Sequence, residues 1–348
     1  VIEEDGKTIT VRDAKEGECT VYIHKYEVAG TKEIKDAVLK ITDEAGETVE
    51  EWTTDGVNAK SIALKQGTYT LTEITAPDGY LKAESITFEV DKNGNVKVTS
   101  ETGELKDGKH IYMYDDYTKV EISKVYIVDE ETTELIEGAE LAIYEAAKYE
   151  AANGDTTKLT AVREWTTEAG KPTMIEALPA GKYYLVENAA PAGYLIADAV
   201  PFVVTITEDE NGKQTTEVVK VTMEDKKSEI SINKTDLNGE VVDGAEFTLT
   251  GDDLGGVVIG TGKALEAGTK NVVFAGNQTI TGLKNGTYTL EETTTPDGYL
   301  TVSKFEFTIT DGMVESINGT FTDGDAVIGE DGKTITVSDA KEGECTVY

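Results

Sequence analysis

The sequence predicts an all-β protein made of three tandem β-sandwich domains. Thr, Val, Ile and Tyr are abundant, and Gly is frequent at 34 of 348 residues, a mixture that favours strands and tight turns. Alternating segments are separated by turn residues, and one set of markers recurs three times at a spacing of about 110 residues, the size of one sandwich. Each domain is long enough to bury its own core.

A long repeat frames these domains. Residues 1–22 read VIEEDGKTITVRDAKEGECTVY, and residues 327–348 differ from them only at Glu3/Gly329 and Arg12/Ser338. The period of 326 residues is far longer than a solenoid unit. We therefore expect an array of multi-domain repeats, of which this chain is an internal segment.

The threefold pattern consists of a box and two flanking strands. The box is Tyr-x-Leu-x-Glu-x-x-x-Pro-x-Gly-Tyr, found as YTLTEITAPDGY (69–80), YYLVENAAPAGY (183–194) and YTLEETTTPDGY (288–299). A segment ending in Lys precedes each box: VYIHK (21–25), VEISK (120–124) and ISINK (230–234). A segment ending in Asp follows each box: IYMYD (111–115), VTMED (221–225) and ITVSD (335–339).

These markers predict the domain boundaries. We expect domains at 14–115, 116–225 and 226–339, preceded by the last strand of an earlier repeat (1–13) and followed by the start of the next repeat (340–348). Hairpin turns are predicted at 43–46, 93–95, 211–213 and 237–240. The Ala- and Glu-rich segment 143–155 predicts a short helical insertion in the second domain.

Charged residues continue the apolar strand faces. Side chains two apart on a strand share a face, so Lys25, Glu73 and Asp115 are each in phase with apolar neighbours. The same phase holds for Lys124, Glu187, Asp225, Lys234, Glu292 and Asp339. A single instance would indicate a strand end emerging into solvent, but three instances in the same order favour inward-facing groups. A buried Lys–Asp ion pair would recur in the same way and stays open as an alternative.

The pattern resembles the Cna protein B-type domains, also called SpaA-like pilin domains, of Gram-positive adhesins and pili. The first-strand Lys, the box and the last-strand Asp carry the resemblance, which covers nearly the whole chain. The third box departs from it at Thr295, where the other two have Ala76 and Ala190. The resemblance implies three immunoglobulin-like, prealbumin-like sandwiches in an elongated rod.

The resemblance also implies a spontaneous isopeptide bond in each domain. The implied bonds are Lys25–Asp115, Lys124–Asp225 and Lys234–Asp339, assisted by Glu73, Glu187 and Glu292. Burial disfavours charge, so a buried Lys becomes a nucleophile while buried Asp and Glu tend to stay protonated. Neutral Lys would attack the Asp carboxyl carbon while Glu polarises the carbonyl and relays protons. The reaction has no turnover, so we do not expect an enzyme.

The remaining features exclude several classes of function. A net charge of −35 argues against nucleic-acid binding, and no apolar stretch is long enough for membrane insertion. His24 and His110 are the only histidines, so we expect no metal site, and no motif indicates a cofactor. The segments 91–95 and 323–331 are interpreted as acidic turns.

The two cysteines occupy the same position of the long repeat. Cys19 is in phase with the buried face of its strand, which favours a small buried hydrophobe. The alternative is an inter-chain disulfide between parallel chains, made by Cys19 and Cys345.

The sequence thus predicts a structural stalk or spacer of a repetitive bacterial surface adhesin or pilus-like fibre. We expect it to be extracellular and anchored to the cell wall in the full-length protein, with neighbouring repeats as its partners. The alternative function is a module that binds a host matrix protein or glycan through exposed loops.

Overall fold

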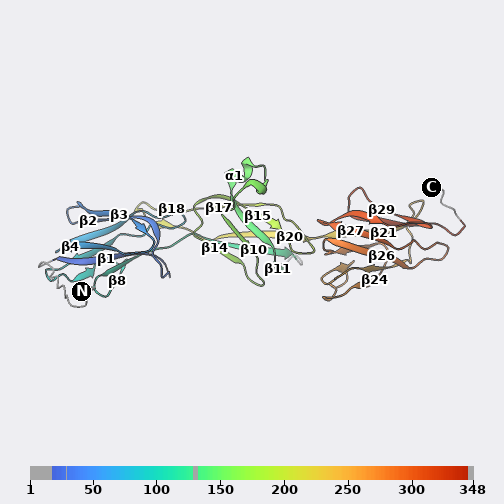
Figure 1. Ribbon diagram of the computed structural model, residues 1–348, viewed down its shortest axis with the longest axis horizontal. Helices are drawn as coiled ribbons and strands as arrows, with labels where there is room; N and C mark the ends of the chain where they lie inside the picture. The colour runs from blue at the N-terminus through green and yellow to red at the C-terminus, as the bar shows by residue number, and fades with distance from the viewer. Residues whose placement is uncertain (1–17, 29, 128–131, 344–348) are drawn as a thin grey trace, which may run out of the picture. The chain divides into compact units, whose positions relative to one another are not determined.

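The computed structural model describes residues 18–28, 30–127 and 132–343 (Figure 1). The predicted strand at 1–13, most of the predicted start of the next repeat, and Cys345 lie outside the described residues. The described chain is nearly all strand and turn, so the predicted all-β class is confirmed. Of the described residues, one compact unit contains those up to 122 with 174–183 and 202–221, and a second contains the rest.

Two sheets form the first sandwich, which lies within the first unit. One has the order β4-β1-β9-β8, with β1 (Glu18–Glu27), β4 (Lys60–Lys65), β8 (Glu104–Lys106) and β9 (His110–Asp115). The other has the order β3-β2-β5-β6-β7, with β2 (Lys35–Asp43), β3 (Thr48–Asp55), β5 (Gly67–Thr75), β6 (Ile86–Val90) and β7 (Val96–Val98). Both contribute to one core, which includes Val21, Ile23, Leu39, Leu71, Phe88 and Met113.

The third sandwich has the same plan within the second unit. One sheet has the order β23-β25-β21-β30-β29, with β21 (Glu229–Asp236), β23 (Val258–Ile259), β25 (Gln278–Thr281), β29 (Gly324–Ile328) and β30 (Thr334–Asp339). The other has the order β24-β22-β26-β27-β28, with β22 (Glu246–Thr250), β24 (Asn271–Ala275), β26 (Gly286–Thr294), β27 (Phe305–Thr310) and β28 (Met313–Asn318).

The strands that lie in the sequence between those of the first and third sandwiches form the middle sandwich. One sheet has the order β11-β10-β20-β16 with β14 also on β10; its strands are β10 (Lys119–Ile127), β11 (Thr133–Leu135), β14 (Thr173–Glu176), β16 (Tyr194–Leu195) and β20 (Val219–Lys227). The other has the order β13-β12-β15-β17, with β12 (Glu140–Glu145), β13 (Arg163–Thr166), β15 (Gly181–Ala189) and β17 (Val200–Val204). A separate hairpin joins β18 (Thr207–Glu208) and β19 (Gln214–Thr215).

The predicted helical insertion is present but shorter than expected. Helix α1 (Ala146–Ala151) and a 3-10 turn (Thr156–Lys158) lie between β12 and β13. Residues 143–145, which we included in the helix, belong to β12 because Ile143 pairs with Arg163 of β13. Ladder pairing there outweighs the helix propensity of the segment.

The predicted hairpin turns are confirmed. In each, a glycine with positive φ donates its N–H to the carbonyl of an Asp three residues earlier: Gly46, Gly94, Gly212 and Gly239. Glycine adopts this backbone conformation without steric cost.

The first and last strands of a sandwich are parallel neighbours. In the first sandwich β1 runs parallel to β9, and in the third β21 runs parallel to β30. The chain therefore enters and leaves such a sandwich at opposite ends of one strand pair.

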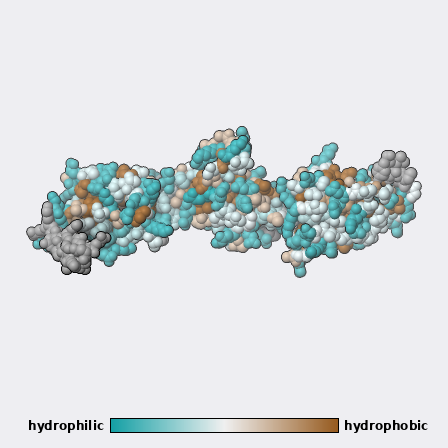
Figure 2. Space-filling model, in the orientation of Figure 1, coloured by the Kyte–Doolittle hydropathy of each residue, from teal (hydrophilic) through white to brown (hydrophobic). Residues whose placement is uncertain are grey.

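Figure 2 shows a face on which hydrophilic residues predominate and hydrophobic residues are scattered. No helix among the described residues is both long and apolar enough to span a membrane.

Candidate functional site

The predicted lysines are buried. Lys25, Lys124 and Lys234 are 1%, 2% and 0% exposed and rank among the largest fully enclosed side chains of the protein. Lysine is almost never fully buried without a partner. The glutamates and aspartates of the predicted pattern are buried as well: Glu73, Glu187, Glu292, Asp115, Asp225 and Asp339.

The structure brings these nine residues together as three clusters of Lys, Glu and Asp. In each cluster the lysine Nζ contacts Oδ1 of the aspartate: Lys25 with Asp115, Lys124 with Asp225, and Lys234 with Asp339. The Nζ also lies close to a glutamate oxygen, at 3.1 Å for Lys25–Glu73, 2.9 Å for Lys124–Glu187 and 3.2 Å for Lys234–Glu292.

The strand register explains the contact between lysine and aspartate. Lys25 lies opposite Met113 in the parallel pair of β1 and β9, and Asp115 is two residues further along. Residues two apart share a face, so Asp115 and Lys25 both point into the core. In the third sandwich Lys234 lies opposite Val337, and Asp339 is again two residues further.

The glutamate comes from the other sheet, and the loop that follows the box holds it in place. One carboxylate oxygen of Glu73 accepts a hydrogen bond from the Ala83 N–H at 2.7 Å. The equivalent bonds are Ala197 N–H to Glu187 at 2.7 Å and Val302 N–H to Glu292 at 2.9 Å. The donor is always ten residues after the glutamate, on the loop that follows the box.

The end of the box is a tight turn. The Tyr80 N–H donates to the Pro77 carbonyl at 3.0 Å, and Gly79 between them has φ of +85°. The same turn occurs at Gly193 and Gly298, with φ of +90° and +87°. A glycine with positive φ at this position is typical of a type II turn.

After the turn, the box pairs with the chain that leaves the last strand. Tyr80 pairs with Tyr117, Tyr194 with Lys227, and Tyr299 with Lys341. Each partner lies two residues after the aspartate of its cluster. The box and the loop that follows it therefore hold both the glutamate and the strand end that carries the aspartate.

The first tyrosine of the box anchors the strand that carries the glutamate. Its hydroxyl donates to the carbonyl four residues earlier, from Tyr69 to Lys65, Tyr183 to Pro179 and Tyr288 to Lys284, at 2.8–2.9 Å. Each ring stacks on a phenylalanine of the next strand: Phe88, Phe202 and Phe307. Thr295, at which the third box departs from the other two, forms a hydrogen bond with the Thr301 hydroxyl at 2.7 Å and does not alter the cluster.

Burial keeps the aspartates protonated more readily than in water. It raises the pKa of Asp115 to about 8, with Glu73 adding to the rise and the Lys25 charge opposing it. Burial likewise raises the pKa of Asp225 to about 7 and of Asp339 to about 6.

Each cluster also leaves two carboxyl oxygens without a hydrogen bond from any described residue. In the first cluster these are Oε1 of Glu73 and Oδ2 of Asp115, and the other two clusters have the same pair of atoms, although Oε1 of Glu292 forms an ion pair with Nζ of Lys234 at 3.2 Å. Such orphaned acceptors are costly when buried. A proton on either carboxyl group would turn it from an acceptor into a donor.

The sequence matches one protein-family model three times. The model described as the SpaA prealbumin-like fold domain matches residues 19–104, 118–223 and 228–325. The matches cover well over half of the chain. The chain belongs to the SpaA prealbumin-like family. The family recognised from the sequence, and the prealbumin-like fold that it implied, are therefore confirmed.

The chain is also similar to several solved structures. The Bacillus anthracis TIE protein is 24% identical over 84% of this chain and 49% of its own length, with a TM-score of 0.35. The open form of the pilus adhesin SpaC from Lactobacillus rhamnosus GG is 15% identical over 95% of this chain and 44% of its own, with a TM-score of 0.35. A streptococcal ancillary pilin is 16% identical over 94% of this chain and 100% of its own, also at 0.35.

The chain therefore spans less than half the length of the first two of these proteins. No curated protein matches the chain.

The three sandwiches share a second element that was not predicted from the sequence. The carbonyl of each cluster lysine accepts an N–H from a residue downstream: Ile34 for Lys25, Ile136 for Lys124 and Val242 for Lys234. These donors begin the similar segments IKDA (34–37), IEGA (136–139) and VDGA (242–245). The third residue has positive φ in all three, and the alanine is buried. The similarity of these three segments in the sequence was the signal that could have revealed this element.

The cysteine and histidine predictions have different outcomes. Cys19 is only 6% exposed within the first core, and burial raises the pKa of its thiol. An inter-chain disulfide stays a prediction, since Cys345 lies outside the described residues.

His24 and His110 come together, with Nε2 of His24 2.9 Å from Nδ1 of His110. The described residues contain no group of three or more metal-ligating side chains.

The acidic turn at 91–95 has a structural role. Oδ1 of Asp91 accepts the N–H groups of Asn93 and Asn95, both at 2.8 Å. In the segment 323–331, Asp331 binds two backbone N–H groups in the same way. Both carboxylates stabilise their own turns.

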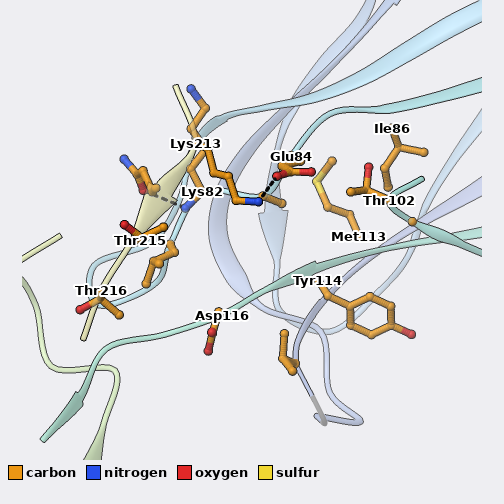
Figure 3. A pocket seen from close by; sticks show the side chains of 15 residues that line it. Lys82, Glu84, Ile86, Thr102, Met113, Tyr114, Asp116, Lys213, Thr215 and Thr216 are labelled. Carbon is orange, nitrogen blue, oxygen red and sulfur yellow. Dashed lines mark hydrogen bonds and ion pairs between the residues drawn. The ribbon is translucent and has the colours of Figure 1, made fainter. Parts of the chain in front are cut away.

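A pocket of about 470 Å³ adjoins the first cluster without opening it (Figure 3). Its wall includes Met113 and Ala83, the residue that holds Glu73. At its rim Lys213 pairs with Glu84 at 2.7 Å. None of Lys25, Glu73 and Asp115 lines the pocket, and the three are at most 1% exposed. The first cluster is therefore closed to solvent.

Proposed function

We propose that this chain is a structural stalk or spacer segment of a repetitive bacterial surface adhesin or pilus-like fibre. Three isopeptide bonds, Lys25–Asp115, Lys124–Asp225 and Lys234–Asp339, stabilise it. The observation that carries the proposal is the contact of a buried lysine with a buried aspartate and a glutamate in each sandwich. Membership in the SpaA prealbumin-like family supports it.

The geometry suits amide formation. A proton passes within the cluster so that the lysine is neutral and the aspartate is protonated, a distribution that burial favours because both ions lose hydration. The lysine Nζ attacks Cγ of the aspartate, the new C–N bond forms, and the carboxyl C–O bond breaks to release one water. The glutamate, in its protonated form, donates a hydrogen bond to the aspartate carbonyl, takes up the proton that Nζ loses and delivers a proton to the leaving hydroxyl, which departs as water. Each site reacts once, so no turnover is expected.

The bond would change how a sandwich carries force. The chain enters the first sandwich on β1 and leaves it after β9, so tension shears two parallel strands. A Lys25–Asp115 bond joins residues 90 apart and removes the segment between them from the load path. Closing loops of this length also stabilises a fold by about 4–5 kcal/mol in the loop-entropy model.

The location follows from this function. We place the segment outside the cell, on the surface of a Gram-positive bacterium, and anchored to the cell wall through the rest of the protein. The neighbouring repeats of the same polypeptide are its structural partners.

Intact mass spectrometry tests the proposal. The purified chain should weigh three water molecules less than its sequence, and Glu73→Ala, Glu187→Ala and Glu292→Ala should each restore one water. A mass equal to that of the sequence would rule out the bonds and leave buried ion pairs as the interpretation.

A further inference from the structure

The backbone of the reactive lysine lies just beyond the end of a strand ladder. Strand β4 begins at Lys60, which pairs with Ile23, two residues before Lys25. Strand β25 begins at Gln278, which pairs with Ile232, two residues before Lys234. The N–H and C=O groups of Lys25 and Lys234 point to the side on which the neighbouring strand has ended, because alternate residues point to alternate sides.

Other groups replace the missing strand. The carbonyl of Lys25 accepts the Ile34 N–H at 2.6 Å, and the carbonyl of Lys234 accepts the Val242 N–H at 3.0 Å. The Lys25 N–H donates to Oε2 of Glu33 at 2.9 Å. The Lys234 N–H donates to Oδ1 of Asn277 at 2.7 Å.

The two acceptors reach the same position by different routes. Glu33 is 8 residues after its lysine, whereas Asn277 is 43 residues after its lysine, in the turn between β24 and β25. Each acceptor is itself held. The other oxygen of Glu33 lies 2.7 Å from Nδ1 of His24, and Asn277 has φ of +60° with its amide nitrogen 3.4 Å from the Val242 carbonyl.

We infer that Glu33 and Asn277 are positioning residues for the isopeptide reaction proposed above. Each holds the backbone of its lysine on the side away from the parallel last strand, where the antiparallel neighbour has ended. The lysine side chain is enclosed in the core, so a shift of its backbone displaces Nζ relative to the aspartate carbon. Displacing a reacting group by about 1 Å can slow a reaction by about a hundredfold.

Bond formation should be followed site by site in the full chain. The chain is synthesised in a short cell-free pulse, denatured at intervals and digested, and the crosslinked peptides are quantified by mass spectrometry. Asn277→Gly keeps the left-handed backbone but removes the acceptor. It should slow the Lys234–Asp339 bond by about ten- to a hundredfold and leave Lys25–Asp115 unchanged. Asn277→Asp keeps the oxygen and should restore the rate.

The first sandwich provides the reciprocal test and a second opportunity if one variant fails to fold. Glu33→Ala should slow only the Lys25–Asp115 bond, and Glu33→Gln, which keeps an acceptor oxygen, should restore it. The crosslinks at the other sites of the same chain are the internal control.

Two failures can be told apart. The absence of every crosslinked peptide from the wild-type chain would overturn the proposed function itself. Normal bond formation in the wild type with unchanged rates in Asn277→Gly and Glu33→Ala would overturn only the positioning role. Equal slowing by Asn277→Gly and Asn277→Asp would likewise show that the acceptor oxygen is not responsible.

Discussion

The first and third sandwiches contain the same buried cluster in different surroundings. Both place a lysine on the first strand, an aspartate on the parallel last strand and a glutamate on the facing sheet. The group that holds the lysine N–H is Glu33 in one and Asn277 in the other. The residues of the cluster are thus the same in both sandwiches, whereas the residue that accepts the lysine N–H differs between them.

The outward faces of the same strands differ even more. In the first sandwich Tyr22 stacks on His110, and His24 stacks on Tyr112, at ring distances of 4.7 and 4.2 Å. In the third sandwich the equivalent side chains are small and polar: Ser231, Asn233, Thr235, Thr334, Thr336 and Ser338. Because the rings stack face to face between strands, they reinforce the parallel pair that the bond would cross-link.

The largest expected difference comes from removing the lysine. Lys25→Ala and Lys234→Ala should each abolish one proposed bond and leave the aspartate and glutamate carboxyl groups buried without the lysine. We expect the affected sandwich to melt more than about 15 °C lower in calorimetry, from the loss of about 4–5 kcal/mol of loop closure. In single-molecule pulling, each variant should show one new unfolding step of a full sandwich.

The matched control is Lys171→Ala, since the Lys171 side chain is 63% exposed. It should leave both the melting temperature and the pulling trace unchanged. Full-length unfolding steps in the unmodified chain would contradict the force-bearing role.

A pH series should sharpen the comparison between the two aspartates. In Lys25→Met and Lys234→Met the aspartate stays a free buried acid, with a pKa raised by burial above its unfolded value. The folded state then binds the proton more tightly, so its stabilising effect is complete at low pH and is lost as pH rises through the folded pKa. The free energy of unfolding should fall by up to about 1.4 kcal/mol per pH unit.

Burial raises the pKa of Asp115 to about 8 and that of Asp339 to about 6 against the opposing charge of the lysine, which the variants lack, so the loss should continue to at least these pH values in the two sandwiches. Chemical denaturation from pH 4 to 9 measures the effect. The wild type is the control, because the proposed bonds would convert its aspartates to amides, which do not titrate. Stability that rises with pH in the variants would refute the buried-acid interpretation.

The smallest expected difference concerns a turn. Asp36 has φ of +67° where the other sandwiches have Gly138 and Gly244, with φ of +83° and +91°. Left-handed backbone is strained for a residue with a Cβ atom. Asp36→Gly in the Lys25→Met background should raise stability by about 0.5 kcal/mol, measured by urea unfolding. Gly244→Asp in Lys234→Met should lower it by a similar amount, and a destabilising Asp36→Gly would show that the Asp36 side chain contributes more than the strain costs.

The sequence by itself determined the residues of the three clusters. The period of two along a strand puts Lys25, Glu73 and Asp115 on apolar faces. The Pro-x-Gly sequence of the box marks a turn, because glycine readily adopts the positive φ that the turn requires. Such features depend on neighbouring residues, which a sequence displays directly. The helix at 143–155 was the weaker prediction, because pairing of β12 with β13 extends the strand into it.

Only the tertiary structure decided which distant residues meet. Parallel pairing of β1 with β9 brings His24 beside His110, 86 residues away, and the turn after β24 brings Asn277 to Lys234. Register between strands far apart in the chain depends on the packing of whole sheets, and no local pattern encodes it. The chemistry of the clusters was therefore readable from strand phase, whereas the supports that hold each lysine in place followed from the fold.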